Sequence, residues 1–82
     1  MLRRPVWSDA ARADIRALDR ATAMRVFDTL TRYLEGGEGD VKQLQGRDNE
    51  FRLRAGDYRL CFTPEGSLLH IHWVRHRSVA YR

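Results

Sequence analysis

The sequence has little cysteine and no long apolar run, and each shortage excludes a class of protein. Cys61 is the only cysteine, so no disulfide bond can form within the chain, which is typical of a reducing compartment. No apolar run approaches the roughly 20 residues that a membrane-spanning helix needs. The basic residues Arg3 and Arg4 have no apolar segment behind them, as a secretory signal would have. We therefore expect a cytoplasmic protein with no membrane partner.

The short length limits the size of the hydrophobic core. With 82 residues, the chain is expected to form a single domain over residues 1–82. A chain of this size buries only roughly 60% of the surface that it exposes when unfolded, so its core is thin. We expect modest stability for the isolated chain and greater stability when a partner binds the folded state.

Positive charge is concentrated in the second half of the chain and is carried almost entirely by arginine. The net charge is +4: residues 1–40 have seven basic and seven acidic residues, whereas residues 41–82 have eight basic and four acidic residues. Arginine presents a planar fork of donors that matches phosphate geometry, and it stacks on bases. The pattern favours a polyanionic partner such as nucleic acid, although a solvated, arginine-rich surface would have the same composition.

The first half of the chain shows helical periodicity after a short strand. Residues 3–7 are expected to form the strand, and Ser8 or Asp9 to cap a helix of about ten residues. Asp19 is a candidate cap for a longer helix over about residues 20–35. Apolar residues follow the helical period at Ala23, Val26, Phe27, Leu30, Tyr33 and Leu34.

The second half alternates apolar and polar residues, which predicts antiparallel strands. Residues 41–44 form a short strand or extended segment, and residues 51–54, 58–63 and 69–74 form three strands joined by tight turns. The apolar stripe of the helices and the apolar faces of the strands must both be buried, and they can bury each other. We therefore expect an α+β fold of order β-α-α-β-β-β. Its two N-terminal helices would pack on one face of an antiparallel sheet. In the final strand Leu69, Ile71 and Trp73 would share one face.

Alternation also places several arginines together. If the apolar residues of the strands bury against the helices, Arg52, Arg54 and Arg59 project from the opposite face and form an anion-binding surface. Two alternatives remain open at this stage. The arginines could simply keep the outer face soluble, or Arg59 could pair with Asp57 or Glu50 to hold the hairpin.

Three other kinds of side chain could take part in binding or catalysis, but their sequence patterns are weaker evidence of function. His70 and His72 lie two residues apart on a strand. No third candidate ligand lies at a sequence spacing typical of a metal site, so no metal site is expected. Cys61 lies within a strand and fits a small buried residue better than a nucleophile. Tyr81 follows a basic stretch and could stack on a splayed base, or it could pack back onto the core.

Four segments are distinctive in combination. They are Trp7-Ser8, residues 39–46 (GDVKQLQG), residues 51–60 (FRLRAGDYRL) and residues 74–81 (VRHRSVAY). With these segments the chain resembles the RelE/ParE superfamily of toxins of type II toxin–antitoxin systems over essentially its whole length. The resemblance implies the same architecture, with two helices on an antiparallel sheet.

The resemblance to RelE-like toxins implies an activity and partners. The expected activity is cleavage of messenger RNA in the A site of the 70S ribosome, which inhibits translation. The expected mechanism is attack of the 2′-hydroxyl on the adjacent phosphate, with no metal or other cofactor. A cognate antitoxin would neutralise the toxin in a hetero-oligomer, with an acidic helical segment over the basic surface or the helix pair.

The resemblance also assigns roles to individual residues. Arg59 matches a phosphate-stabilising arginine, Arg52 a basic residue on the preceding strand, and Arg75 a basic residue after the final strand. Tyr81 matches a tyrosine that stacks on a base. Further candidates for RNA binding are Lys42, Arg54, Arg77 and Arg82, and Arg77 could instead bind antitoxin carboxylates.

The chain departs from the RelE pattern at Glu50, where relatives have a basic residue. Arginine stays protonated and is a poor general base, so we expect Glu50 or His76 to act as the base, with Glu38 as a further candidate. Two alternative functions remain. One is a ParE-like toxin that inhibits DNA gyrase, and the other is a catalytically inactive module that binds only an antitoxin.

Overall fold

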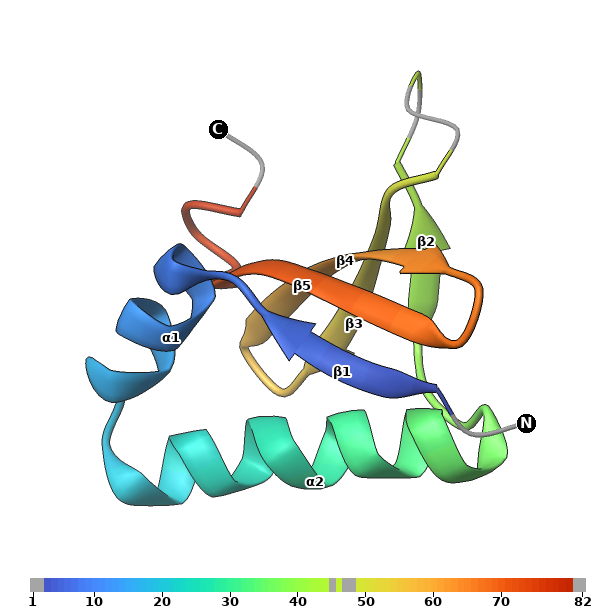
Figure 1. Ribbon diagram of the computed structural model, residues 1–82. Coiled ribbons are helices and arrows are strands. Elements are labelled where there is room, and N and C mark those ends of the chain that lie inside the picture. The colour runs from blue at the N-terminus through green and yellow to red at the C-terminus, as the bar shows by residue number, and fades with distance from the viewer. Residues whose placement is uncertain (1–2, 45, 47–48, 81–82) are drawn as a thin grey trace.

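The computed structural model describes residues 3–44, 46 and 49–80, which form two helices and a five-stranded sheet (Figure 1). The elements in chain order are β1 (Arg4–Trp7), α1 (Asp9–Arg16), α2 (Arg20–Gly36), β2 (Val41–Gln43), β3 (Phe51–Ala55), β4 (Tyr58–Glu65) and β5 (Leu68–His76). In Figure 1 the long helix α2 runs beneath the sheet, and residues 77–80, which follow β5, rise on the side away from α2.

The sheet has the strand order β1-β5-β4-β3-β2. Neighbouring strands from β2 to β5 are antiparallel, whereas β1 pairs with β5 in parallel. The predicted α+β class, with two N-terminal helices packed on the sheet, is confirmed. Two details of the predicted order differ: residues 41–43, expected as a short strand or an extended segment, add an edge strand to it, and the sheet is mixed rather than antiparallel. The sequence could not show the second detail, because alternation does not reveal which neighbour a short first strand takes.

Helix α2 begins and ends at the residues that its sequence favours. The Asp19 carboxylate accepts hydrogen bonds from the backbone N–H of Thr22, at 3.2 Å, and from the Thr22 hydroxyl. Both hydrogen bonds lower the pKa of Asp19, and the bond from the Thr22 hydroxyl has the larger effect. The stability that this cap contributes is therefore present at neutral pH and is lost as the pH falls through the lowered pKa. At the other end Gly37 adopts the left-handed conformation (φ 74°) that commonly terminates helices.

Helix α1 packs beside the part of β5 that extends beyond the end of β1, and its side chains bond the free edge of that strand. Ser8 is its N-cap: the Ser8 hydroxyl accepts from the Ala11 N–H at 3.0 Å and donates to the His72 carbonyl at 2.8 Å. Further along the helix, the Asp14 carboxylate accepts from the backbone N–H of Val74 at 2.9 Å. These side chains satisfy polar groups of β5 that β1 is too short to reach.

The core lies between the helices and one face of the sheet. Its largest fully buried side chains include Phe62, Leu53, Leu60, Leu69, Ile71 and Val26. The Phe62 ring stacks on Phe51 at a centroid distance of 5.6 Å and meets Tyr33 at 5.4 Å. Two members of the predicted helical stripe lie outside this core: Ala23 is only partly buried, and Phe27 is 39% exposed, with its ring 5.5 Å from that of Trp7.

Gly39 is required by the close approach of the chain to the core just before β2. Its φ is +147°, and an added Cβ would lie 2.8 Å from Cδ1 of the fully buried Leu53. We expect Gly39→Ala to lower the free energy of unfolding by about 1–3 kcal/mol, through overpacking and backbone strain. Gly36→Ala is the matched control, because its Cβ would have no neighbour closer than 4.0 Å. Urea denaturation of both variants measures the difference, and equal midpoints would contradict it.

Candidate functional site

The strand register brings the basic side chains of β2 to β5 onto one face of the sheet. Lys42 is paired with Arg52, and Arg54 with Arg59, which in turn is opposite Arg75. The row between them, Leu53, Leu60 and Val74, is buried against the helices. Because side chains alternate between faces, the basic residues project from the face opposite the helices. We call the residues Lys42, Arg52, Arg54, Arg59 and Arg75 the basic face.

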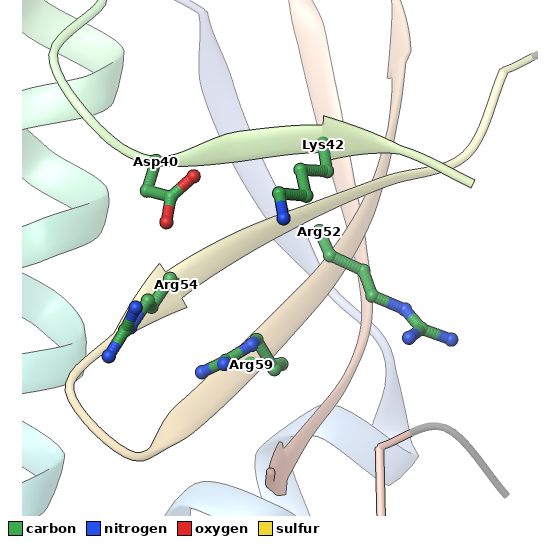
Figure 2. A pocket seen from close by; sticks show the side chains of 5 residues that line it. All are labelled: Asp40, Lys42, Arg52, Arg54 and Arg59. Atoms are coloured by element: carbon green, nitrogen blue, oxygen red, sulfur yellow. The ribbon is translucent and has the colours of Figure 1, made fainter.

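A small hollow of about 60 Å³ lies on this face, lined by Asp40, Lys42, Arg52, Arg54 and Arg59 (Figure 2). Figure 2 shows the Arg54 and Arg59 side chains extending toward the same side, whereas Arg52 extends the opposite way. Four cationic groups surround one carboxylate, so the hollow is positively charged. Arrangements of this kind attract phosphate oxygens.

Backbone carbonyls hold two of these guanidinium groups at the β3–β4 turn. Arg59 Nη1 donates to the carbonyls of Tyr58 at 3.1 Å and Gly56 at 3.4 Å, and Arg54 Nε donates to Gly56 at 3.3 Å. Arg59 forms no ion pair with a carboxylate in the part of the chain that the structure describes, so the alternative of a pair with Asp57 is not observed there. Bonds to carbonyls orient Arg59 without neutralising its charge.

A second hollow, of about 230 Å³, adjoins the first and shares Arg52 with it. Its lining residues are Leu44, Glu50, Arg52, Cys61, Trp73, Arg75 and Ala80. The guanidinium carbons of Arg75 and Arg52 lie 4.5 Å and 5.4 Å from the centroid of the Trp73 ring. These distances are within the range of cation–π contacts. The predicted base candidate Glu50 therefore lies in a hollow with two of the predicted arginines.

The C-terminal segment folds back over the basic face beside β5. Residues 77–80 form a turn in which the backbone N–H groups of Val79 and Ala80 donate to the His76 carbonyl at 2.9 and 3.1 Å. Ala80 is buried and lines the second hollow. The predicted site residues Tyr81 and Arg82 follow directly and lie outside the described residues.

The structure separates His76 from the arginines. His76 is opposite Tyr58, whose ring it meets edge-on at 5.3 Å, and Tyr58 packs against the helix-side core. Consecutive residues of a strand face opposite ways, so His76 and Arg75 lie on different faces of the sheet. The other base candidate, Glu38, is exposed between α2 and β2. The exposed Arg77 donates its backbone N–H to the Asp57 carbonyl at 2.7 Å.

A bulge in β5 explains why Trp73 and Arg75 share the basic face. The register shifts between Cys61 and Phe62: Cys61 is opposite Trp73, but Phe62 is opposite Ile71, which leaves His72 as an extra residue. Because of this extra residue, each later side chain of β5 lies on the opposite face of the sheet from the one that strict alternation predicts. The sequence prediction that Trp73 shares a face with Ile71 is therefore wrong, and alternation gave no signal for the bulge.

The two strand histidines have separate polar partners. His72 Nε2 lies 2.7 Å from the Thr63 hydroxyl, and His70 Nε2 lies 3.1 Å from a Glu65 carboxylate oxygen. Over residues 3–44, 46 and 49–80, no group of three or more His, Cys, Asp or Glu side chains is placed to hold a metal ion. Neither α1 nor α2 is long and apolar enough to cross a membrane.

The sequence matches the family model described as the ParE toxin of type II toxin–antitoxin system, parDE, over residues 6–81. No curated protein matches the sequence.

Several solved structures share the fold. A chain of the archaeal RelE–RelB complex from Pyrococcus horikoshii OT3 superposes with a TM-score of 0.78 at 20% identity, covering 98% of this chain and 100% of that one. A chain of the RelB–RelE antitoxin–toxin complex from Methanococcus jannaschii gives 0.76 at 19% identity, covering 93% and 94%. The YoeB dimer from Staphylococcus aureus gives 0.76 at 15% identity, covering 93% and 98%. At these identities the similarity establishes the fold.

Proposed function

The chain belongs to the ParE toxin family of type II toxin–antitoxin systems, within the RelE/ParE superfamily, and we propose that it cleaves ribosome-bound messenger RNA. The observation that carries this proposal is the basic face, where four arginines and one lysine from four strands gather opposite the helices. Such a surface fits a phosphodiester backbone. Because the helices cover the opposite face of the sheet, they would stay available to other partners.

Cleavage would proceed by internal transesterification. The 2′-oxygen of one nucleotide bonds to the adjacent phosphorus while the bond from phosphorus to the 5′-oxygen of the next nucleotide breaks. The products are a 2′,3′-cyclic phosphate and a 5′-hydroxyl. Negative charge grows on the phosphate oxygens in the transition state, and Arg59, held by carbonyls at the β3–β4 turn, would stabilise it. Arg52 and Arg75, which lie beside the second hollow, would hold the flanking backbone.

Glu50 is the base that this arrangement favours. A carboxylate can accept the proton of the 2′-hydroxyl, whereas arginine stays protonated throughout the working range of pH. Glu50 lines the second hollow together with Arg52 and Arg75, whereas His76 is on the opposite face of the sheet. A second proton must reach the departing 5′-oxygen, and solvent can supply it, because Arg75 at the edge of the hollow is exposed.

A cognate antitoxin is the protein partner that the family implies, and similar chains were solved as RelB–RelE complexes. Two surfaces could receive an acidic, amphipathic helix. One is the basic face. The other is a mainly apolar hollow of about 250 Å³ beside the helix pair, lined by Trp7, Arg12, Ile15, Arg16 and Phe27. Occupation of the basic face would block RNA directly.

The test of this proposal is induction of the chain alone in growing bacteria, followed by mapping of new RNA 5′ ends. We expect cuts within translated codons. When a translation inhibitor is added so that ribosomes no longer load the messages, the RNA should stay intact. Intact messages together with trapped gyrase–DNA complexes would overturn the proposal in favour of gyrase inhibition. Normal growth with neither lesion would instead indicate an inactive module that binds an antitoxin.

A further inference from the structure

Trp73 is an aromatic residue that contacts two arginines of the basic face. It lies on the basic face rather than in the core, because the bulge at His72 turns it away from Ile71. Its ring is half-buried and has two guanidinium groups against it, that of Arg75 at 4.5 Å and that of Arg52 at 5.4 Å. One arginine comes from the same strand and the other from β3, two strands away.

The residue between Arg52 and Trp73 makes the longer contact possible. Arg52, Cys61 and Trp73 form one cross-strand row on β3, β4 and β5. Cys61 is small and 1% exposed, so the Arg52 side chain can pass over it and reach the indole ring. A row of three large side chains would hold the guanidinium away from β5.

Holding two long cationic side chains in one arrangement has an electrostatic and an entropic cost, and the Glu50 carboxylate in the same hollow offsets part of the first. Arg52 and Arg75 carry like charges, which repel each other, and each side chain loses rotamer freedom when it is held in one place. The face of an indole ring attracts guanidinium groups and restricts their motion. With the ring as a common surface, the two cations are held in place before any substrate arrives, which lowers the entropic cost of productive binding.

We propose that Trp73 is a positioning residue, which sets the spacing of the Arg52 and Arg75 guanidinium groups for a phosphodiester through its indole ring. This role rests on the RNA cleavage proposed above. Trp73 contributes no charge of its own and acts through the two arginines.

The first experiment compares Trp73→Leu and Trp73→Phe on translating ribosomes programmed with a short message. Leucine keeps the charge of the site but removes the aromatic face, so we expect kcat to fall about tenfold, which corresponds to about 1.4 kcal/mol, with KM changed much less. Phenylalanine should restore most of the rate. Trp7→Leu is the matched control: Trp7 packs against Phe27 on the helix side, so this variant should lose stability but keep its kcat per folded molecule.

The second experiment reads the contact itself and needs no RNA. Stacking on an indole shifts the NMR signals of arginine Nε–Hε groups upfield, so the Arg52 and Arg75 signals should move toward ordinary positions in Trp73→Leu, whereas the Arg54 signal should not. Unmoved Arg52 and Arg75 signals, or an unchanged kcat in Trp73→Leu, would overturn the positioning role. If the wild-type protein cleaves no RNA although these signals shift, the nuclease proposal fails, and with it the positioning role in cleavage, but the stacking itself stands.

Discussion

Replacing Arg59 by alanine is expected to lower the rate of RNA cleavage by about 10²–10³-fold, the usual loss when one preorganised donor to a developing oxyanion is removed. Arg59 stands in the middle of the basic face, between Arg54 and Arg75, and lines the first hollow. Its guanidinium is oriented by the Gly56 and Tyr58 carbonyls, so it is already in place when the phosphate charge develops. Cells that express the Arg59→Ala chain should grow normally.

Two companion variants separate this effect from a general loss of charge. Arg32→Ala removes the same charge from the exposed surface of α2 and should leave the cleavage rate unchanged. Arg59→Lys keeps the charge but not the planar fork of donors, so its rate should fall between those of Arg59→Ala and the wild type. The measurement is the rate of message cleavage on programmed ribosomes. Equal losses in Arg59→Ala and Arg32→Ala would show that Arg59 has no special part in the reaction.

Replacing Phe62 by alanine is expected to lower the free energy of unfolding by about 3–5 kcal/mol, through lost burial and the cavity left behind. The Phe62 side chain is fully buried, and it packs between the rings of Phe51 on β3 and Tyr33 on α2. It therefore joins the sheet to the long helix. Small domains have a total stability of about 5–15 kcal/mol, so this one substitution removes a large share of it.

Phe27→Ala is the control for the Phe62 variant, because it removes the same side chain from a partly exposed position beside Trp7. Phe27→Ala should lower the free energy of unfolding by less than half as much as Phe62→Ala does. Urea denaturation followed by circular dichroism gives both values from the midpoints and slopes. A midpoint for Phe62→Ala equal to that of Phe27→Ala would mean that the helix–sheet contact is not the main source of stability.

Much of the fold could be predicted because its signals are local. The side chains of Ser8 and Asp19 cap the two helices, and both are visible in the sequence as residues that favour this position. The alternation in residues 51–54 and 58–63 is enough to give the two strands β3 and β4, and the tight turn between them fixes their antiparallel pairing. This pairing alone sets Arg54 beside Arg59.

The position of β1 and the facing of β5 could not be predicted in this way. Strand β1 pairs with β5 across more than sixty residues of sequence, and nothing local indicates that partner. The bulge at His72 depends on how β5 fits against Cys61 and Phe62, and alternation assumes that no such bulge exists. Without the bulge, Trp73 and Arg75 would face the helices, and His76 would lie with the arginines instead.

The amino-acid sequence by itself determined the basic character of the second half, the two capped helices and the β3–β4 hairpin that carries Arg52, Arg54 and Arg59. Each of these depends on residues that are close together in the chain. Only the tertiary structure decided that Arg75 and Trp73 join them, that His76 does not, and that Glu50 and Ala80 line the same hollow. Those placements follow from strand register and chain reversal, which are set by packing between distant segments.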